Sequence, residues 1–331
     1  MSASRRIFLH ALFATCGAGF TAACTDVRPS TSTATAAELG SGVAYPSSAV
    51  YDARAGVLLV ASYTNGSIQR VAITGGMRST SSPVLPLDGR EHVLRIRLDA
   101  QRQRIWVLAS DAVYVYDYVN SRLTHRIAID ALAQHSSDHC LPDMALDRFG
   151  NAFVSSATQT LLTRIDAESL ELTQRELQLD SDQDKDFGFS ALAFVGRSDT
   201  LYAASASTGA LWRIDPAQNR AIKMDISQPV FGACALQATS SGRPDSASGA
   251  DLVLYVAGGF HDGVKRIELS KTDLPYRVTT LQTARPLIAP TDFVAVNSQL
   301  LIVSSQLSRH PDFNGDGEMR APFTLVPIVK P

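Results

Sequence analysis

The sequence is dominated by a short apolar run that returns about every 47 residues, and this period limits the folds that the chain can adopt. Between the second residues of successive copies the steps are 47, 47, 49, 53 and 47 residues. A period of roughly 40–50 residues built from short strands is typical of the blades of a β-propeller. The six copies occupy residues 58–61, 105–108, 152–155, 201–204, 254–257 and 301–304.

Other runs flank these copies and indicate further strands. A second run follows most copies and alternates apolar with polar residues, which is the two-residue period of a half-buried strand. Turn pairs such as Asn65-Gly66 and Asp262-Gly263 favour tight hairpins between the runs. A shorter strand precedes the core run. In a propeller this innermost strand lines the central channel, with its first residues at one mouth.

These patterns predict an all-β fold, a six-bladed β-propeller with four-stranded blades over residues 43–331. A chain of 331 residues is long enough for two domains, but the repeat continues without a break and favours one. The start of the domain, near residues 42–45, is expected to supply the outer strand of the last blade and to close the ring. Trp106 and Trp212 fall on repeat positions and are predicted core residues.

The N-terminus resembles an export signal of the twin-arginine type. Arg5 and Arg6 lie in a basic segment, an apolar stretch follows, and small residues precede Cys24. Residues 21–24 resemble a lipobox, whose cysteine becomes lipidated after cleavage. The sequence therefore predicts a signal peptide over residues 1–23 and a lipid on Cys24.

The alternative is an ordinary cleaved signal, with a second possible cleavage site at residues 34–36 and no role for Cys24. Residues 24–42 are rich in Ser, Thr, Ala and Gly and are predicted to be a flexible tether. The expected location is the bacterial cell envelope, on the periplasmic side or at the cell surface, where the chain is a lipid-anchored membrane protein.

Charge and cysteine content exclude some classes of function. The formal net charge is −2 and both signs are mixed along the chain, so no basic footprint for nucleic acid is present. The four cysteines form no C-x-x-C pair, which argues against a structural zinc site. The expected partners are a small molecule or an envelope protein, besides the membrane, and the chain is predicted to be a monomer.

Residues 142–155, which run Pro-Asp-Met-Ala-Leu-Asp-Arg-Phe-Gly-Asn-Ala-Phe-Val-Ser, resemble the gluconolactonase and senescence-marker-protein family of six-bladed propellers, the regucalcin-like proteins. The likeness spans residues 43–328 at the level of a superfamily. It implies a divalent cation on the channel axis, held by a glutamate, an asparagine and an aspartate, which polarises a lactone carbonyl and a water. In this chain those positions fall on Ser47, Ser190 and Gly232, so the metal ligands are degenerate.

Because those ligands are missing, we expect an exported lipoprotein propeller that binds a ligand or partner and lacks metal-dependent lactone hydrolysis. The alternative is a divergent metal-dependent lactonase or esterase of the cell envelope that uses Asp143 and Asp292. A channel mouth is the expected binding site, although each polar residue there has a simpler role in hydrogen-bonding neighbouring backbone. The predicted mouth residues are Ser47, His92, Asp143, Ser190 and Asp292.

A polar run near the C-terminus matches the opening of a calcium-binding loop. Alternating oxygen side chains can wrap one Ca²⁺, whose role here would be structural. The twelfth position is Phe323 rather than a bidentate glutamate, so the loop is no complete EF-hand, and the alternative is a hydrated turn. The predicted ligands are Asp312, Asn314, Asp316 and Glu318.

Two groups of cysteine and histidine residues leave alternatives open. His135, Asp138, His139 and Cys140 can in principle ligate zinc or copper, but their irregular spacing favours a solvated loop. Cys140 could pair with Cys234 in an oxidising compartment. A buried thiol at Cys234 is favoured instead, because Cα atoms more than about 7 Å apart across the channel could not be bridged.

Overall fold

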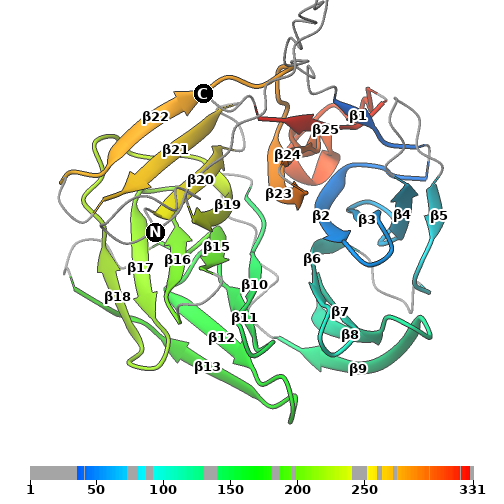
Figure 1. The fold of residues 1–331 in the computed structure, drawn as a ribbon, viewed down its shortest axis with the longest axis horizontal. Helices are drawn as coiled ribbons and strands as arrows, with labels where there is room; N and C mark the ends of the chain where they lie inside the picture. Colours follow the sequence, from blue (N-terminus) through cyan, green and yellow to red (C-terminus); the bar gives the residue numbers. More distant parts are fainter. Residues whose placement is uncertain are drawn as a thin grey trace, which may run out of the picture. The chain divides into compact units, whose positions relative to one another are not determined.

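The computed structural model describes residues 36–40, 42–72, 81–86, 92–129, 140–180, 187–195, 199–240, 252–258, 263–270, 274–297, 299–320 and 322–328. Within these residues, six antiparallel sheets of four main strands surround a common axis (Figure 1). The chain is therefore a six-bladed β-propeller, as the repeat predicts. Two short 3₁₀ helices, η1 (Leu307–Arg309) and η2 (Pro311–Phe313), follow the second strand of the last blade.

Each blade begins at the axis with an inner strand and ends at the rim with an outer strand (Figure 1). The inner strands are β2 (Pro46–Asp52), β6 (Val93–Asp99), β10 (Met144–Leu146), β15 (Ala191–Phe194), β19 (Ala233–Ser240) and β23 (Pro290–Val296). The second strands are β3 (Val57–Ser62), β7 (Arg104–Ala109), β11 (Ala152–Ser155), β16 (Leu201–Ala204), β20 (Leu252–Gly258) and β24 (Gln299–Ser304).

The two outermost positions of each blade follow the same order. The third strands are β4 (Ile68–Ala72), β8 (Ala112–Asp117), β12 (Leu161–Ile165), β17 (Leu211–Asp215), β21 (Val264–Leu269) and β25 (Thr324–Pro327). The outer strands are β5 (Ser81–Pro83), β9 (Arg122–Ala128), β13 (Leu172–Glu176), β18 (Arg220–Lys223), β22 (Arg277–Leu281) and β1 (Ala37–Glu38). In the fourth blade the short strand β14 (Gln178–Leu179) adds to β18 in parallel.

The ring closes through β1, which pairs antiparallel with β25 and completes the sixth blade. Ala37 lies opposite Leu325, and Glu38 lies opposite Thr324. An N-terminal strand closes the ring as predicted, but it precedes the expected residues 42–45 and falls inside the predicted tether. A strand of two residues pairs through its backbone and is too short to show a two-residue period.

Packing between blades explains why the core runs are apolar on both faces. In β3, Leu58 and Val60 pack in the cluster that contains Val303 of the sixth blade, whereas Leu59 packs in the cluster that contains Val107 of the second blade. Alternate residues of one strand thus face opposite neighbours. Trp106 is buried in the first of these clusters and Trp212 in a separate one, which confirms the prediction that both are core residues.

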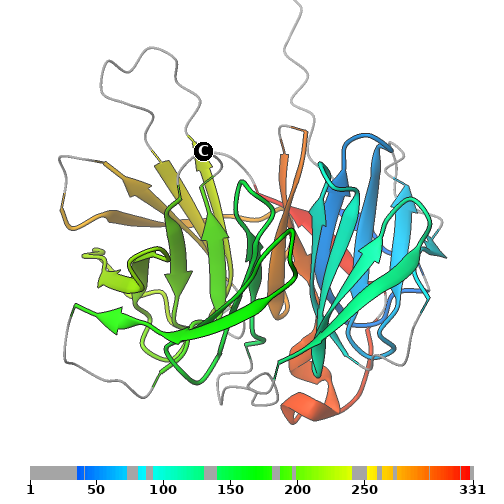
Figure 2. The same cartoon turned by 90° about the horizontal axis from the view of Figure 1, so that it is seen from below.

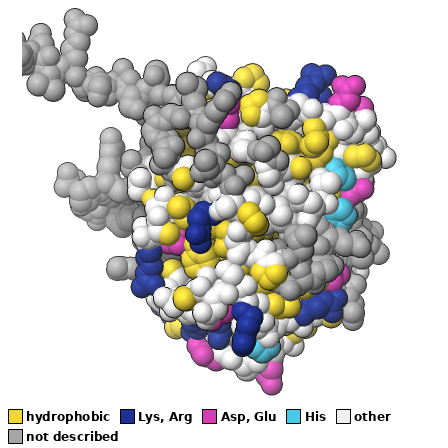
Figure 3. Space-filling view, turned by 90° about the vertical axis from the view of Figure 1, so that its right-hand side faces the viewer, with side chains coloured by type: hydrophobic (Ala, Val, Ile, Leu, Met, Phe, Trp, Pro, Cys, Tyr) yellow, Lys and Arg dark blue, Asp and Glu magenta, His cyan; other side chains and the backbone are white. Residues whose placement is uncertain are grey.

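Among the described residues, no helix is long and apolar enough to cross a membrane. Figure 2 shows the blades from the side, with the segment that contains η1 and η2 at one end of the ring. On the face drawn in Figure 3, basic and acidic side chains are interspersed rather than gathered by sign. The described residues drawn there form no extended basic surface.

Candidate functional site

Four inner strands carry a β-bulge near their first residues. The register shifts between Pro46 and Ser48 in β2, between Val93 and Arg95 in β6, between Ala233 and Ala235 in β19, and between Pro290 and Asp292 in β23. A bulge re-aims the side chains beside it. These bulges surround the axis, where the side chains of the candidate site meet.

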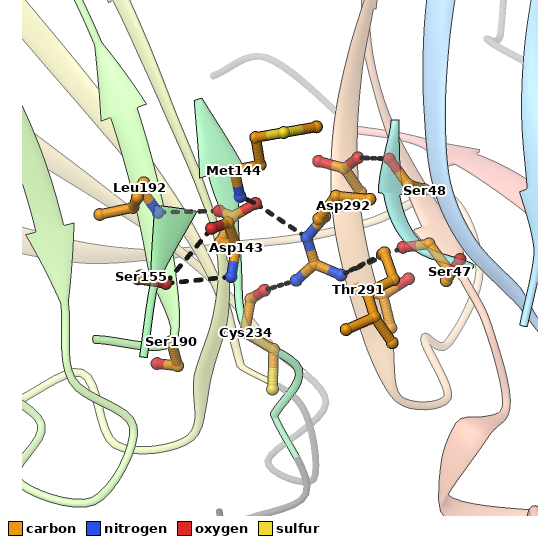
Figure 4. A network of polar contacts seen from close by, with 12 residues as sticks. Ser47, Ser48, Asp143, Met144, Ser155, Ser190, Leu192, Cys234, Thr291 and Asp292 are labelled. Carbon is orange, nitrogen blue, oxygen red and sulfur yellow. Dashed lines mark hydrogen bonds and ion pairs between the residues drawn. The ribbon is translucent and has the colours of Figure 1, made fainter. Parts of the chain in front are cut away.

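Arg95 of β6 lies fully buried among these bulges. Its Nε donates to Asp143 Oδ1 at 2.8 Å, and its Nη2 donates to the carbonyl oxygen of Cys234 at 2.9 Å. Its Nη1 donates to the carbonyl oxygens of Leu94 at 2.9 Å and Ser47 at 3.4 Å. The three acceptors in other blades, Asp143, Cys234 and Ser47, are labelled in Figure 4 and come from three different blades.

The carboxylate of Asp143 is enclosed by donors. Besides Arg95, its Oδ1 accepts from Arg97 Nη2 at 3.0 Å and from the Met144 N–H at 2.7 Å. Its Oδ2 accepts from the N–H of Leu192 in the fourth blade at 2.8 Å (Figure 4). Asp143 thereby joins the second, third and fourth blades through one buried charge.

Arg97, two residues further along β6, links Asp143 to Asp292 of β23. Its Nη1 donates to Asp292 Oδ2 at 2.9 Å, and that oxygen also accepts from the Ser48 hydroxyl. Burial alone would lower the pKa of Arg97, but the carboxylates of Asp292 and Asp143 outweigh it and hold the pKa above its ordinary value. Two arginines and two aspartates therefore form a charge-balanced cluster on the axis.

Cys140 and Cys234 form a disulfide, with their Cα atoms 5.1 Å apart. The favoured interpretation of Cys234 as a buried thiol is therefore wrong. The segment before β10 and the bulged start of β19 come from the third and fifth blades, which approach each other closely near the axis. The distance was overestimated because the inner strands of a propeller converge there.

A pocket of about 410 Å³ lies in the channel, on the side of the charged cluster toward the carboxyl-terminal ends of the inner strands. Its lining comes from the middle and carboxyl-terminal parts of the inner strands, and every blade contributes. Arg97 and Asp292 are the residues of the charged cluster that line it, with side chains 18% and 6% exposed. The volume is within the range of small-molecule sites, roughly 300–1,000 Å³.

The five predicted mouth residues do not form a single group in the structure. The Ser47 hydroxyl donates to the Val93 carbonyl oxygen at 2.6 Å, and the Ser190 hydroxyl donates to the Ala233 carbonyl oxygen at 2.5 Å. Asp143 and Asp292 are brought together by Arg97, and Asp292 is the one of the five that lines the pocket. The serines thus tie neighbouring blades together through their backbones.

His92 lies away from this cluster. Its ring stacks on Tyr63 with centroids 4.5 Å apart, and its Nε2 is 3.7 Å from Asp312 Oδ2. Tyr63 Oη donates to the same carboxylate at 3.0 Å, and burial together with Asp312 raises the pKa of Tyr63. The ring of His310 meets Tyr63 edge-on, and burial lowers the pKa of His310. These rings fasten the segment with η1 and η2 to the first two blades.

The predicted calcium ligands lie partly in that segment. Asp312 is in η2, and Asn314 follows the helix in the left-handed conformation, with φ 60°. Asp316 Oδ1 accepts from the N–H of Glu318 at 2.9 Å. The described residues hold no group of three or more His, Cys, Asp or Glu placed to bind a metal ion. Calcium binding by this loop remains a prediction.

Calcium at 10 mM is expected to stabilise the protein by about 1.4–2.7 kcal/mol if the loop binds with the millimolar to submillimolar affinity of extracellular sites. Asp316→Ala should reduce that gain, because it removes one carboxylate ligand. Thermal unfolding with and without calcium measures the effect. Asp199→Ala, which removes an exposed carboxylate elsewhere, should leave it intact. No calcium-dependent shift in the wild type would exclude the loop as a calcium site.

Six of the residues to which the sequence assigns a role lie outside the described part of the chain. They are Arg5, Arg6, Cys24, His135, Asp138 and His139. The sequence reasoning also missed Arg95 and Arg97, which occupy alternate positions of an inner strand that is otherwise apolar up to its last residue, Asp99. Two arginines on one face of a strand that lines the axis are the signal that could have revealed the cluster.

No family model matches the chain, and no curated protein matches it in sequence. Solved structures share its fold. The major allergen Mala s 1 of Malassezia sympodialis is 14% identical over 86% of this chain and 93% of its own, with a TM-score of 0.57. A calcium-binding protein, regucalcin, from Agrobacterium tumefaciens is 11% identical over 86% and 91%, with a TM-score of 0.56. An auxiliary nutrient binding protein from Bacteroides thetaiotaomicron is 13% identical over 86% and 68%, with a TM-score of 0.56. At such identities the likeness shows the fold alone.

Proposed function

We propose that this chain is an exported six-bladed propeller that binds a small-molecule ligand in its central pocket and lacks metal-dependent lactonase chemistry. The observation that carries the proposal is the buried guanidinium of Arg95 on the axis. It donates to backbone oxygens of Ser47 and Cys234, next to positions where the regucalcin-like family would hold its cation. A divalent cation there would meet a fixed positive charge, without the carboxylate ligands that it needs.

The alternative of a divergent lactonase depends on Asp143 and Asp292. Asp143 is held by two guanidiniums and two backbone N–H groups, and Asp292 is held by Arg97 and Ser48. A general base must be able to reach a water or substrate, and a metal ligand needs free lone pairs. Asp143 does not line the pocket, and its contacts favour a structural role. Asp292 lines the pocket, but the Arg97 guanidinium beside it opposes a cation, so the geometry favours a binding role for this residue. The nutrient binding protein of similar fold is consistent with a binding module.

A screen of metabolites by thermal shift, followed by calorimetry, tests the proposal. Ala295→Trp adds an indole to an exposed residue of the pocket lining and should weaken a ligand found in this way by roughly tenfold or more, which corresponds to 1.4 kcal/mol. Ala217→Trp, at an exposed turn outside the pocket, is the matched control and should bind normally. Equal binding by both variants would contradict a pocket site. Chelator-sensitive hydrolysis of gluconolactone would contradict the absence of lactonase chemistry.

We also propose that the chain works at the bacterial cell envelope, held by a lipid on Cys24 after export through the Arg5-Arg6 signal. The support is the order of basic segment, apolar stretch, small residues and cysteine. Labelling of cells with radioactive palmitate should mark the wild type and not Cys24→Ala. Equal labelling of the two would remove the anchor from the proposal.

A further inference from the structure

We propose that the central pocket selects an uncharged amphiphile, with an apolar body and a hydroxyl or carboxamide group at its inner end. This inference rests on the proposed function, because it names the class of ligand that the pocket would take. Three observations carry it: the apolar walls, the hydrogen-bonding groups left over at the floor, and the charge balance of the cluster beneath.

The walls of the pocket are apolar in every blade. Inner strands contribute Val50, Leu98, Leu146, Phe194, Leu236 and Phe293 to the lining. Four of these six, Val50, Leu98, Leu146 and Phe194, are only half-buried, although they surround the axis of the protein. A ligand that covers them removes apolar surface from water, which favours binding. The walls therefore favour an apolar ligand body.

The floor offers both a donor and an acceptor. Arg97 uses Nη1 and Nη2 for Asp292 and Asp143, whereas its Nε has no acceptor among the described residues. Asp292 Oδ1 accepts a hydrogen bond from the N–H of Phe293, which leaves a further lone pair. A hydroxyl or carboxamide can accept from the guanidinium and donate to the carboxylate together. A pure acceptor or a pure donor satisfies only one of them.

The charge balance of the cluster argues against a charged head group. Arg95 and Arg97 are matched by Asp143 and Asp292, so a ligand charge would have no counter-charge at the floor. A carboxylate beside Arg97 would also lie near Asp292, and an ammonium beside Asp292 would lie near Arg97. An uncompensated charge in a desolvated site is costly, and like charges in contact suppress binding. At the rim, Asp52 accepts from the Tyr118 hydroxyl, and its negative charge is offset by the nearby guanidinium of Arg54, which also lines the pocket.

The test uses four probes with one chain length: octan-1-ol, octanamide, octanoate and octyltrimethylammonium. Calorimetry at neutral pH and below micelle-forming concentrations should show the alcohol and the amide binding roughly tenfold or more tightly than either ion. Phe194→Ala, in the wall, should weaken the two neutral probes without disturbing the charged cluster. Ala217→Trp should bind as the wild type does.

Each other outcome overturns the inference. Octanoate or octyltrimethylammonium binding as tightly as octan-1-ol would show that the floor does not select against charge, while binding in the pocket would stand. Failure of all four probes would exclude an amphiphile as the ligand class, and the metabolite screen would then decide the proposed function separately. Neutral probes that bind Ala295→Trp and the wild type alike would place them outside the pocket.

Discussion

Replacement of Asp143 by alanine is expected to lower the free energy of unfolding by about 3–5 kcal/mol. The reason is that Arg95 and Arg97 would both lose a buried counter-charge, and Arg95 is fully enclosed. The N–H of Leu192 would also lose its acceptor, which loosens the contact between the third and fourth blades. Urea denaturation followed by tryptophan fluorescence measures the change.

An ion pair at the surface provides the matched control. Arg148 contacts Asp199 at 3.0 Å, but both side chains are largely exposed. Asp199→Ala should therefore cost about 1 kcal/mol or less. A loss of similar size in Asp143→Ala would show that the cluster on the axis contributes little to stability, and that water reaches it freely.

Removal of the disulfide is expected to cost about 2–5 kcal/mol. The bond joins residues 94 positions apart, so its loss frees a long loop in the unfolded chain. It also releases the segment before β10 from the start of β19, where Cys234 provides the carbonyl oxygen that Arg95 binds. Unfolding of the double variant Cys140→Ala/Cys234→Ala, compared with the wild type in oxidising buffer, measures the loss.

Reductant supplies the control for that experiment. The wild type should lose stability when the bond is reduced, whereas the double variant should be insensitive to reductant. Alkylation of Cys140 and Cys234 in the oxidised wild type, detected by mass spectrometry of their peptides, would contradict the bond itself. Stability unchanged by reduction would show that packing alone holds the two strand starts together.

The fold could be predicted because it repeats. A six-fold period averages over the errors of any one blade, so the second strands and most of the inner strands were found from apolar runs. The closing strand was misplaced because Ala37–Glu38 has no repeat partner in sequence and pairs through backbone atoms. Local sequence patterns predict where strands form, but they do not show which strand pairs with a strand from the other end of the chain.

The candidate site was predictable only in part. Asp143 and Asp292 were identified from their places near the starts of inner strands, but their partners come from β6, in another blade. The disulfide likewise depends on how closely two non-adjacent blades approach at the axis, which no spacing in the sequence records. The pocket lies beyond the predicted mouth because the charged cluster of Arg95, Arg97, Asp143 and Asp292 lies on the axis, and only Arg97 and Asp292 of that cluster reach the pocket.

The closure of the ring has a mechanical consequence. The described chain enters the propeller at β1, which is held to β25 by two residue pairs and, just beyond, by the Leu39 N–H on the Phe323 carbonyl oxygen. A pull on the chain from its N-terminal side would load this seam before any other strand. The sixth blade would then peel open from the rim, while the inner strands stay joined by the charged cluster and the disulfide. Force applied to a tether would thus be absorbed far from the pocket.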